Sequence, residues 1–472
     1  MTTPPRAFTA GALLLGLLVA VTPALVFAGG YNLAGVGAKA LAMSGAFRAV
    51  ADDYSATFWN PAGLIGQPRI ATLDGKVLFP MVWLTPNVTS SYAGYEGYRN
   101  GVEQTTNAKS YPAPTFGLTW PVNEKFTAAL GVYAPSALGA EWSNLFTGPP
   151  YGYNNTVPFP EKAWTSDLKV IDFHPTIAYR VSDKLKLGVG LAAEYGDVTI
   201  RSPKMSPSGA PVPFQAFYVD ATLKGTGWGY GFNVGAMYDV CKDWTLGLSY
   251  RGPVEIAVEG NVEQTLILPT SAGVVAADPT KAPFFSGGSL SASPDATADF
   301  PLPADVGLGI AWRDCCSGLL LAADVVWTNW GAIKDVTIDM TGNGPTGAPA
   351  TDSELILRYK DTYRISLGAD YAMPSKIKDL HIRGGYYFDP TPIPDGSLRP
   401  SITDVADKHN ISLGFSCAPA QNVILEGYYE RIMTGTRTVV SEDMDGDHIA
   451  DNLGGDWKLQ VDTFGLSIGY KF

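Results

Sequence analysis

Four aspartates in one polar stretch near the C-terminus have the spacing of a cation-binding loop. They are Asp443, Asp445, Asp447 and Asp451. Carboxylate oxygens at alternating positions suit a hard cation such as Ca²⁺. The stretch departs from the EF-hand pattern, because His448 stands where that loop requires glycine. The spacing indicates either a structural Ca²⁺ site, the one cofactor site that the sequence suggests, or a solvated acidic loop.

Three arginines form the second group of residues that could do chemistry. In the segment from Leu355 to Tyr371, Arg358 and Arg364 fall on a polar face opposite Leu, Ile and Tyr, and Arg383 follows on the next segment. A guanidinium forms charge-assisted hydrogen bonds with carboxylates, so this face could bind a carboxylate ligand. The alternative is pairing with acids of the protein itself. Those acids are Asp324, Glu426, Glu430, Asp52 and Asp53.

Other kinds of chemistry find little support in the sequence. The four histidines are scattered, and no nucleophile–base arrangement is visible, so we expect no enzyme activity. The cysteines Cys241, Cys315, Cys316 and Cys417 all fall in short polar turns. A bridge from Cys241 to Cys315 or Cys316 is geometrically conceivable, but pairing cannot be read from sequence.

The elements that must position these side chains alternate in polarity with a period of two. In residues 185–196 the odd positions are Leu, Leu, Val, Leu, Ala and Tyr, whereas the even positions are Lys, Gly, Gly, Ala, Glu and Gly. Residues 244–251 and 305–312 follow the same rule. A period of two places the two sets on opposite sides of a strand.

The connections between these strands alternate between short and long. Six short turns are predicted at 121–124, 181–183, 240–243, 313–316, 374–376 and 417–420, and seven long loops lie around 85–110, 135–166, 201–216, 258–297, 331–353, 389–406 and 438–456. Together they separate fourteen strands. This pattern predicts an all-β transmembrane barrel of fourteen antiparallel strands with short periplasmic turns. A soluble β-sandwich is the alternative, but it would not sort its loop lengths so regularly.

Both ends of the chain indicate export to the bacterial outer membrane. Arg6, an apolar stretch and Pro23 precede Val26-Phe27-Ala28, which predicts a signal peptide over residues 1–28; the alternative, a membrane anchor, needs about 20 uninterrupted apolar residues. The last segment alternates and ends on Phe472, as in the terminal strands that the barrel-assembly machinery recognises. Outer-membrane lipid and this machinery are therefore expected partners, with the protein a monomer.

The composition fits this class and excludes others. The chain has 33 Lys+Arg against 45 Asp+Glu, a net charge of −12, so it lacks the basic surface that nucleic-acid binding needs. Hydrophobic residues make up 46% and charged residues 17%. In a barrel, much of the apolar fraction faces lipid.

Residues 29–68 do not alternate and carry the most specific motifs. GAKALAMSGAF spans 37–47, and Asp52-Asp53 and Asn60-Pro61-Ala62-Gly63-Leu64 follow; later motifs are LPADVGLG at 302–309, WTNW at 327–330, PIPD at 392–395 and HNISLG at 409–414. These motifs resemble the FadL/TodX family of outer-membrane transporters of long-chain fatty acids and aromatic hydrocarbons. The resemblance implies an N-terminal hatch of short helices (residues 29–68, with Asp52, Asp53, Asn60, Pro61 and Ala62) that plugs a barrel formed by residues 69–472.

The resemblance also implies a function: uptake of hydrophobic small molecules. A substrate would be captured among the outer loops, bound in a lumen pocket and released laterally near a kink in the third strand, which would be Phe126–Ala134 before Pro135. The expected apolar lining is Leu138, Trp142, Leu145, Phe146, Phe214, Phe217, Phe284 and Phe285. Loop packing or anchoring at the lipid interface is the alternative role for these aromatics.

Three other functions compete with uptake. A structural or adhesive barrel would act through its outer loops, and an outer-membrane hydrolase would need a catalytic set at the rim. A general diffusion porin would need an open lumen, which the predicted hatch argues against.

Overall fold

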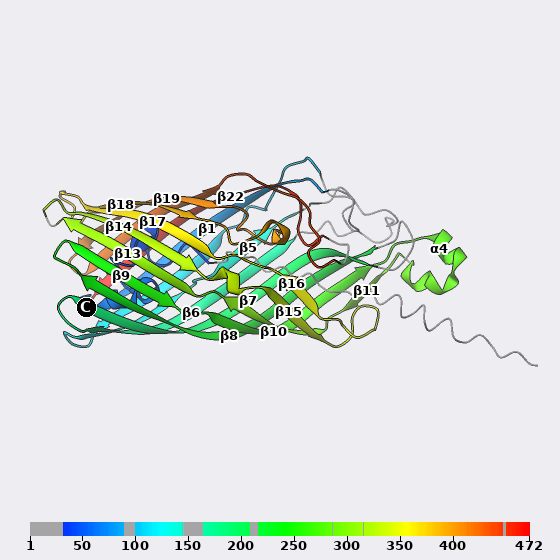
Figure 1. Cartoon of the computed structure of the whole chain (residues 1–472), viewed down its shortest axis with the longest axis horizontal. Coiled ribbons are helices and arrows are strands. Elements are labelled where there is room, and N and C mark those ends of the chain that lie inside the picture. The colour runs from blue at the N-terminus through cyan, green and yellow to red at the C-terminus, as the bar shows by residue number, and fades with distance from the viewer. Residues whose placement is uncertain are drawn as a thin grey trace, which may run out of the picture.

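The computed structural model describes residues 32–88, 100–143, 145, 164–207, 216–285, 287–314, 316–446 and 450–472. The predicted signal peptide lies outside them. The described strands form one antiparallel sheet that closes on itself as a barrel, with the C-terminus at one end and helix α4 (Ala272–Ala277) beyond the other (Figure 1). Closure joins β1 (Ile70–Pro86) to β22 (Gly455–Lys471), from Ile70 opposite Lys471 to Pro86 opposite Gly455.

The described wall contains fourteen strands, as predicted. Eight of them run without interruption: β1, β3 (Tyr111–Pro121), β6 (Thr165–Arg180), β7 (Leu185–Pro207), β8 (Ala216–Asp239), β18 (His381–Asp389), β19 (Lys408–Ala420) and β22. Six are each built from two segments: β4 (Phe126–Tyr133) with β5 (Ala137–Glu141), β9 (Trp244–Arg251) with β10 (Val254–Ile267), β12 (Asp295–Leu302) with β13 (Asp305–Asp314), β14 (Leu319–Thr328) with β15 (Asp335–Thr341), β16 (Ser353–Ile356) with β17 (Thr362–Ala372), and β20 (Val423–Thr434) with β21 (Arg437–Val439). Two further short strands, β2 (Gln104–Thr105) and β11 (Ser289–Ala292), pair antiparallel with the ends of β1 and β10 in the outer loops.

The short turns lie at the end that also holds the C-terminus, and four of them match the predicted positions closely. The predicted turn at 417–420 is wrong, because β19 continues to Ala420 and Cys417 pairs with Leu425 inside the sheet. The predicted loops at 201–216 and 258–297 are too long, because β7 continues to Pro207 and β10 to Ile267, each paired with β8. In these segments the alternation continues among more polar residues, so a fall in hydrophobicity does not mark the end of a strand.

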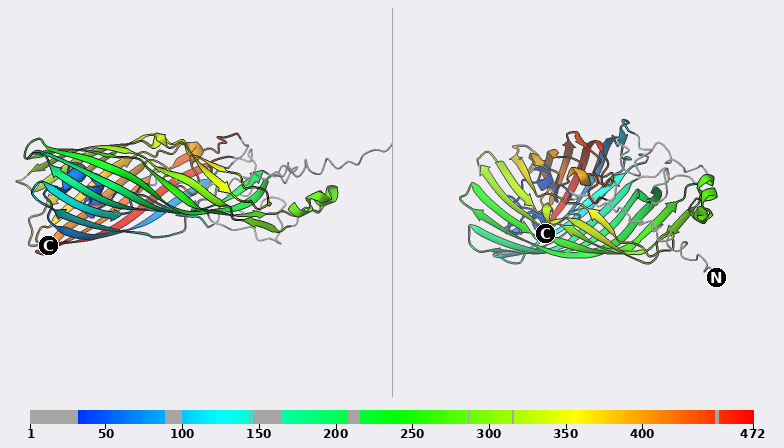
Figure 2. Two further views of the ribbon diagram at one scale, coloured as in Figure 1. Left: turned by 90° about the horizontal axis from the view of Figure 1, so that it is seen from below. Right: turned by 45° about the vertical axis from the view of Figure 1, so that its right-hand side comes forward.

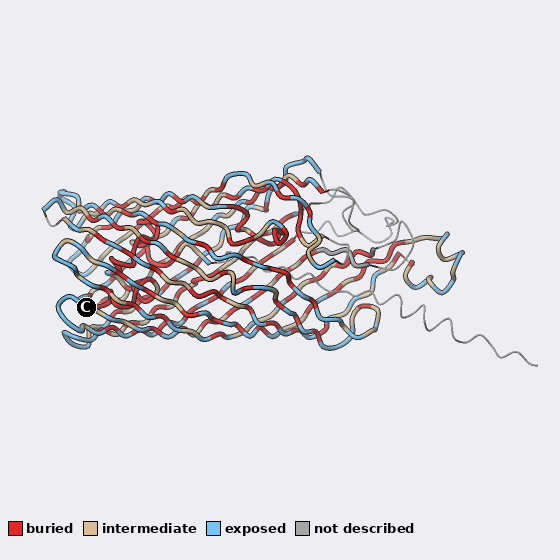
Figure 3. Tube along the Cα trace, in the orientation of Figure 1, coloured by how far each residue is buried: buried red, intermediate tan, exposed pale blue. Residues whose placement is uncertain are grey.

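The two faces of the wall differ as the alternation predicts. On β22 the outward side chains Phe464 and Leu466 are 55% and 60% exposed, whereas the lumen-facing Thr463 and Ser467 are buried. Exposed and buried residues alternate along most strands (Figure 3). The outward apolar side chains are those that meet lipid in a membrane barrel.

The N-terminal segment fills the lumen at the short-turn end. It contains α2 (Ala38–Ala42), α3 (Ala56–Trp59) and the 3-10 helix η1 (Pro61–Leu64). Figure 2 shows this dark blue segment enclosed by the wall strands. The remaining 3-10 helices lie in the outer half: η2 (Pro279–Phe284), η3 (Trp330–Ala332) and η4 (Asp395–Ser397). Among the described residues, no helix has the length and apolar character to cross a membrane.

Candidate functional site

The hatch, residues 32–68, folds into the lumen because its residues are small and its chain reverses sharply. Gly37 and Gly45 have φ angles of 90° and 76°, a region that favours glycine. The apolar residues Met43, Phe47, Trp59 and Leu64 are buried in a cluster with alanines of the wall strands. The helices are too short to be stable alone, so packing inside the barrel must hold them.

Wall glycines make room for this close approach. A Cβ at Gly188, Gly235 or Gly385 would lie within 3 Å of hatch atoms, namely those of Pro61, of Asn60, or of Met43 and Ser44. The lumen-facing glycines that the alternation marked are therefore sites where wall and hatch backbones meet.

Asn60, Pro61 and Ala62, which mark the hatch motif, lock one corner of the hatch. The Asn60 amide donates to the carbonyl oxygens of Arg48 at 2.8 Å and of Ala236 on β8 at 3.1 Å. Its Oδ1 accepts from the Ala62 N–H at 3.2 Å, which caps η1, and Pro61 occupies the first turn, where no N–H is needed. The Asn60 side chain thus forms hydrogen bonds both within the hatch and to the wall strand β8.

Asp324 on β14 holds the turn that follows α2. Its Oδ2 accepts from the backbone N–H groups of Phe47 and Arg48, both at 2.9 Å. The Arg48 guanidinium lies 3.7 Å from the same oxygen and reaches Asp305 at 3.3 Å. Asp324 is buried, so these partners compensate a charge that water cannot reach.

Asp52 and Asp53 lie at the short-turn end of the hatch and differ in environment. Asp52 forms an ion pair with Lys39 at 2.8 Å, and Arg313 lies 3.8 Å from it. Asp53 accepts from the N–H and hydroxyl of Ser55 through Oδ1. Removal from water, with the nearby carboxylate of Glu426, raises the pKa of Asp53 to about 7.

The three predicted arginines do not share one site. Arg364 on β17 donates to the hatch carbonyl oxygens of Ala34 at 3.1 Å and Ser44 at 3.2 Å, and its guanidinium lies over the ring of Tyr387. Arg383 on β18 is buried between Asp370 and Glu426, at 3.1 and 2.8 Å.

Arg358 does not lie in a strand, so its predicted position is wrong. The predicted continuous strand from Leu355 to Tyr371 is broken between β16 and β17, and Arg358 has a φ of 48° in the break. The chain leaves the wall there because Leu357 and Tyr359 turn into the apolar interior instead of facing lipid. Arg358 is left half exposed, 3.8 Å from Asp335.

Strand pairing in the wall is interrupted in the third strand, at the predicted kink, and this break in pairing at residues 134–136 is called the wall opening. Tyr133, the last residue of β4, faces Asp172, and Ala137, the first residue of β5, faces Lys169 on the same neighbour β6. Three residues, 134–136, thus stand opposite two, 170 and 171, a one-residue bulge. In the described residues β5 pairs with β6 alone, so β3 loses its neighbour beyond the pair of Phe116 with Val132.

The start of the described chain occupies this opening. The Leu33 N–H donates to the carbonyl oxygen of Pro135 at 3.0 Å. Asn32 bridges to Ser136, whose hydroxyl donates to the Asn32 Oδ1 at 3.0 Å. The hatch and the wall opening are therefore directly connected by the same few residues.

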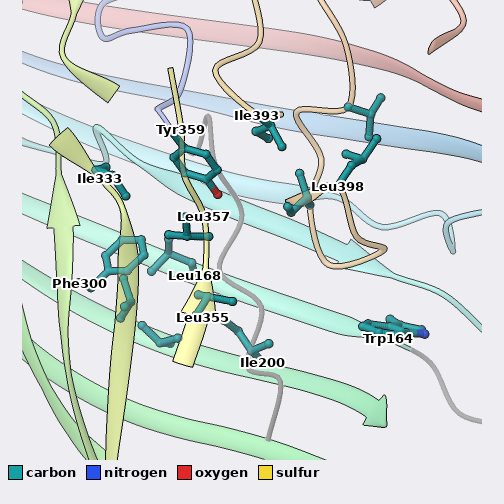
Figure 4. Close-up of a cluster of buried hydrophobic side chains, with 14 of the residues drawn as sticks. Trp164, Leu168, Ile200, Phe300, Ile333, Leu355, Leu357, Tyr359, Ile393 and Leu398 are labelled. Atoms are coloured by element: carbon teal, nitrogen blue, oxygen red, sulfur yellow. The ribbon is translucent and has the colours of Figure 1, made fainter. Parts of the chain in front are cut away.

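An apolar cluster fills the outer half of the lumen beyond the hatch. Trp142 and Leu145 from the second outer loop are almost fully buried in it. Trp142 donates to the carbonyl oxygen of Pro400 at 2.6 Å and packs edge-on against Trp457. Figure 4 shows Ile393 and Leu398, from the loop after β18, near Tyr359 and Leu357, with wall residues such as Leu168 and Phe300 below.

A second apolar cluster lies at the outer tip. Phe217 on β8 and Phe285 are buried against one another with ring centroids 5.8 Å apart, and Leu266, Leu268 and Phe284 pack around them. Leu138 lies in β5 opposite Leu168. Phe146 and Phe214 lie outside the described residues.

Three of the four predicted metal-binding aspartates converge. Asp443, Asp445 and Asp451 each offer a carboxylate oxygen, and these atoms lie within 4.8 Å of one another. The N–H groups of Met444 and Gly446 donate to Asp451 and Asp443 at 2.8 and 2.6 Å, which folds the loop around them. Asp447 lies outside the described residues.

Sequence reasoning missed several lumen residues that anchor the hatch. Asp74 on β1 accepts from the Ala38 N–H at 2.9 Å and from the Tyr54 hydroxyl at 2.8 Å. Asn233 on β8 donates to the Thr57 carbonyl oxygen at 2.7 Å and also contacts the ring of His174. The signal was present, because a charged or amide side chain on the Gly- and Ser-rich face of a barrel strand needs a partner in the lumen.

The chain resembles known proteins along most of its length. The long-chain fatty acid transport protein of Salmonella typhi is 25% identical over 381 residues, which is 78% of this chain and 79% of that protein. The crystal structure of a Pseudomonas aeruginosa FadL homologue covers 94% of this chain and 100% of its own at 18% identity and a TM-score of 0.72. That of the P. putida toluene transporter TodX covers 93% and 99% at 17% identity and a TM-score of 0.70. The likeness to these two structures shows the barrel fold.

The sequence profile described as "Outer membrane protein transport protein (OMPP1/FadL/TodX)" matches residues 19–472, and the chain therefore belongs to this family of outer-membrane transport proteins.

Proposed function

We propose that this transporter takes up hydrophobic small molecules through the apolar lumen and releases them sideways through the wall between β3 and β5. The observation that carries the proposal is the bulge at residues 134–136, filled by Asn32 and Leu33 of the hatch segment. Withdrawal of these two residues would open the wall towards lipid. A lateral exit suits a water-insoluble substrate, which then never crosses an aqueous channel.

Capture begins at the outer tip. The outer-tip cluster presents the partly exposed ring of Phe284, which packs on the buried pair of Phe217 and Phe285. The interior cluster around Trp142 and Leu398 continues the apolar path inwards to the hatch. A substrate moving along this path exchanges one apolar contact for another.

Of the three arginines, Arg358 is the most accessible to a carboxylate group on the substrate. Arg383 already contacts two carboxylates, and Arg364 contacts two hatch carbonyl oxygens. Arg358 is half exposed and adjoins Leu357 and Tyr359 of the interior cluster. The acyl chain of such a substrate would therefore contact the apolar residues of the interior cluster, and its carboxylate would contact Arg358.

Uptake by cells tests this function. Some relatives are named for long-chain fatty acids and others for toluene, so a strain lacking the gene is supplied with labelled oleate or toluene. The wild-type gene is expected to restore uptake of one substrate class, and Leu398→Asp to abolish it. Val102→Asp, at an exposed loop position, is the matched control. Equal uptake with and without the gene for both substrates would disprove the proposal.

The acidic outer loop is proposed as a structural Ca²⁺ site. The convergence of Asp443, Asp445 and Asp451 supports it, and oxygen donors suit this ion. Arg399 approaches Asp451 at 3.3 Å and would have to share that carboxylate. Titration calorimetry with Ca²⁺ should show submillimolar affinity that Asp445→Asn weakens; no heat below millimolar Ca²⁺ would exclude the site.

We also propose the route to the membrane. Residues 1–28 act as a signal peptide that is removed before Gly29, and the alternating segment that ends at Phe472 addresses the chain to the barrel-assembly machinery. The mature protein works as a monomer; one chain closes its own barrel, so no second copy is needed to complete the wall. Mass spectrometry of the mature N-terminus and light scattering of the purified protein test the first and last of these statements.

A further inference from the structure

A depression opens on the outer, lipid-facing side of the wall where β20, β22 and β1 meet. It measures about 530 Å³ and is lined by Phe79, Tyr429, Arg431, Asp462 and Phe464. The strand registers bring these residues together, with Asp462 opposite both Phe79 and Arg431, and Tyr429 opposite Phe464. Phe79 is 45% exposed. The depression faces away from the lumen and is separate from the proposed transport path.

A preorganised polar group forms one side of this depression. Arg431 donates through Nε and Nη2 to the two oxygens of Asp462, at 2.7 and 3.1 Å. The Tyr429 hydroxyl and the Gln460 amide donate to the same carboxylate at 2.5 and 2.9 Å. The Arg431 side chain is 44% exposed, so its guanidinium can accept a further partner from outside the wall.

The height of this group on the wall corresponds to the lipid headgroups. Ten positions separate Asp462 from Phe472 at the short-turn end, which at the usual rise and tilt of a barrel strand is about 25 Å along the membrane normal. That distance equals the usual height of the apolar band. The outward side chains between them include Phe464, Leu466 and Ile468, all apolar and exposed. Arg431 and Asp462 thus lie at the outer edge of the hydrocarbon.

A second cation lies higher on the same face. Lys458 is exposed, on the same side of β22 as Gln460 and Asp462, and its ammonium lies 5.6 Å from the ring centre of Trp83. Trp83 is the partner of Lys458 on β1. Lys458 and the Asp462-paired Arg431 therefore both project outwards on this face, beside the rings of Trp83, Phe79 and Phe464. Phosphate oxygens accept charge-assisted hydrogen bonds from such groups.

We propose that this depression binds a phosphorylated lipid of the outer leaflet. An acyl chain lies against Phe79 and Phe464, and separate headgroup phosphates accept hydrogen bonds from Arg431 and from Lys458. The occupant is a lipid because the depression opens towards the bilayer at the depth where chains meet headgroups. The cations select an anionic headgroup, and basic residues at this level attract anionic lipids.

Native mass spectrometry of the full mature protein in detergent tests the proposal. The probes are diphosphorylated lipid A, the same lipid without phosphates, and inorganic phosphate. Wild-type protein is expected to bind one diphosphorylated lipid A at least tenfold more tightly than the phosphate-free lipid. The triple change Arg431→Gln, Asp462→Asn and Lys458→Gln removes the charges without leaving one unpaired, and is expected to abolish this preference.

A matched control removes a different exposed ion pair. Lys224→Gln with Glu263→Gln eliminates a pair at 2.8 Å on β8 and β10 and should leave lipid binding unchanged. Heat-modifiable electrophoretic mobility checks that each barrel is folded. Should the triple variant not fold, Lys458→Gln alone, which breaks no ion pair among the described residues, must still weaken lipid A binding severalfold. Equal binding by wild type and folded variants, equal binding of both lipids, or competition by inorganic phosphate as effective as by the lipid would each overturn the proposal.

Discussion

Asp324 accepts a hydrogen bond from the backbone N–H of Arg48 at 2.9 Å, while the guanidinium of the same Arg48 lies 3.7 Å from that oxygen. A wall strand and the hatch, 276 residues apart in sequence, are thereby joined through one carboxylate. Because the Phe47 N–H donates to the same oxygen, Asp324 fixes both the backbone and the side chain of this hatch turn.

Replacement of Asp324 by alanine should release the hatch. Two buried N–H groups and the Arg48 guanidinium would lose their acceptor, and breaking a buried pair in this way costs about 3–5 kcal/mol. Planar-bilayer recordings should show little steady conductance for the wild type and frequent openings for Asp324→Ala. Asp299→Ala, at an exposed position on β12, is the control. If the conductance of Asp324→Ala were as low as that of the wild type, Asp324 would not be what holds the hatch in place.

The wall could be predicted from the sequence more fully than the site could. Alternation and turn length are local properties of the sequence. They therefore predict fourteen strands, and the absence of alternation in residues 29–68, without a structure. Leu357 and Tyr359 show what alternation leaves open: an apolar side chain has the same pattern whether it faces lipid or turns into a filled lumen. The partners of Arg364 could not be found either, because Ala34 and Ser44 lie more than 300 residues away and offer backbone oxygens, which every residue has.

Arg364→Ala should weaken binding of charged and neutral substrates to the same extent. Its guanidinium contacts Ala34, Ser44 and the ring of Tyr387, so its loss disturbs the hatch floor and removes no carboxylate partner. Binding of oleate and of a neutral hydrocarbon of equal length would be compared in both proteins, with an unchanged ratio expected. A tenfold loss confined to oleate would instead assign Arg364 to the carboxylate.

Docking of the hatch should weaken as the pH rises from about 4 to about 7. The pKa of Asp53 is raised to about 7 in the folded protein by removal from water and by Glu426, with Asp52 adding to the effect and Lys39 and Ser55 opposing it. Below 3.8, the ordinary pKa of an aspartate, the carboxyl is protonated in both the docked and the released hatch. Between these values the released hatch ionises first, so rising pH favours release.

Proteolysis of the hatch at different pH values measures this effect. Cleavage in residues 32–68 should accelerate between pH 5 and pH 7.5 in wild type, after correction for the protease's own pH dependence. Asp53→Asn, which cannot ionise, should show a flat profile, and Asp278→Asn in the outer loop should behave as the wild type. The same slope in Asp53→Asn would locate the titrating group elsewhere.

Deletion of Pro135 should close the opening in the wall and stop uptake. Three residues stand opposite two between β4 and β5, so removing one restores the register in which the third strand continues along β6. The flanking residues then keep their faces, because β5 already pairs in the register that the deletion makes continuous. The barrel should fold with normal heat-modifiable mobility and still bind substrate at the outer tip, but cells should take up at least tenfold less. The control is deletion of Gly435, which lies between β20 and β21 on the other side of the β1–β22 closure. It shows the effect of losing one residue elsewhere in the wall. If the Pro135 deletion folds and transports at the wild-type rate, release does not occur between β3 and β5.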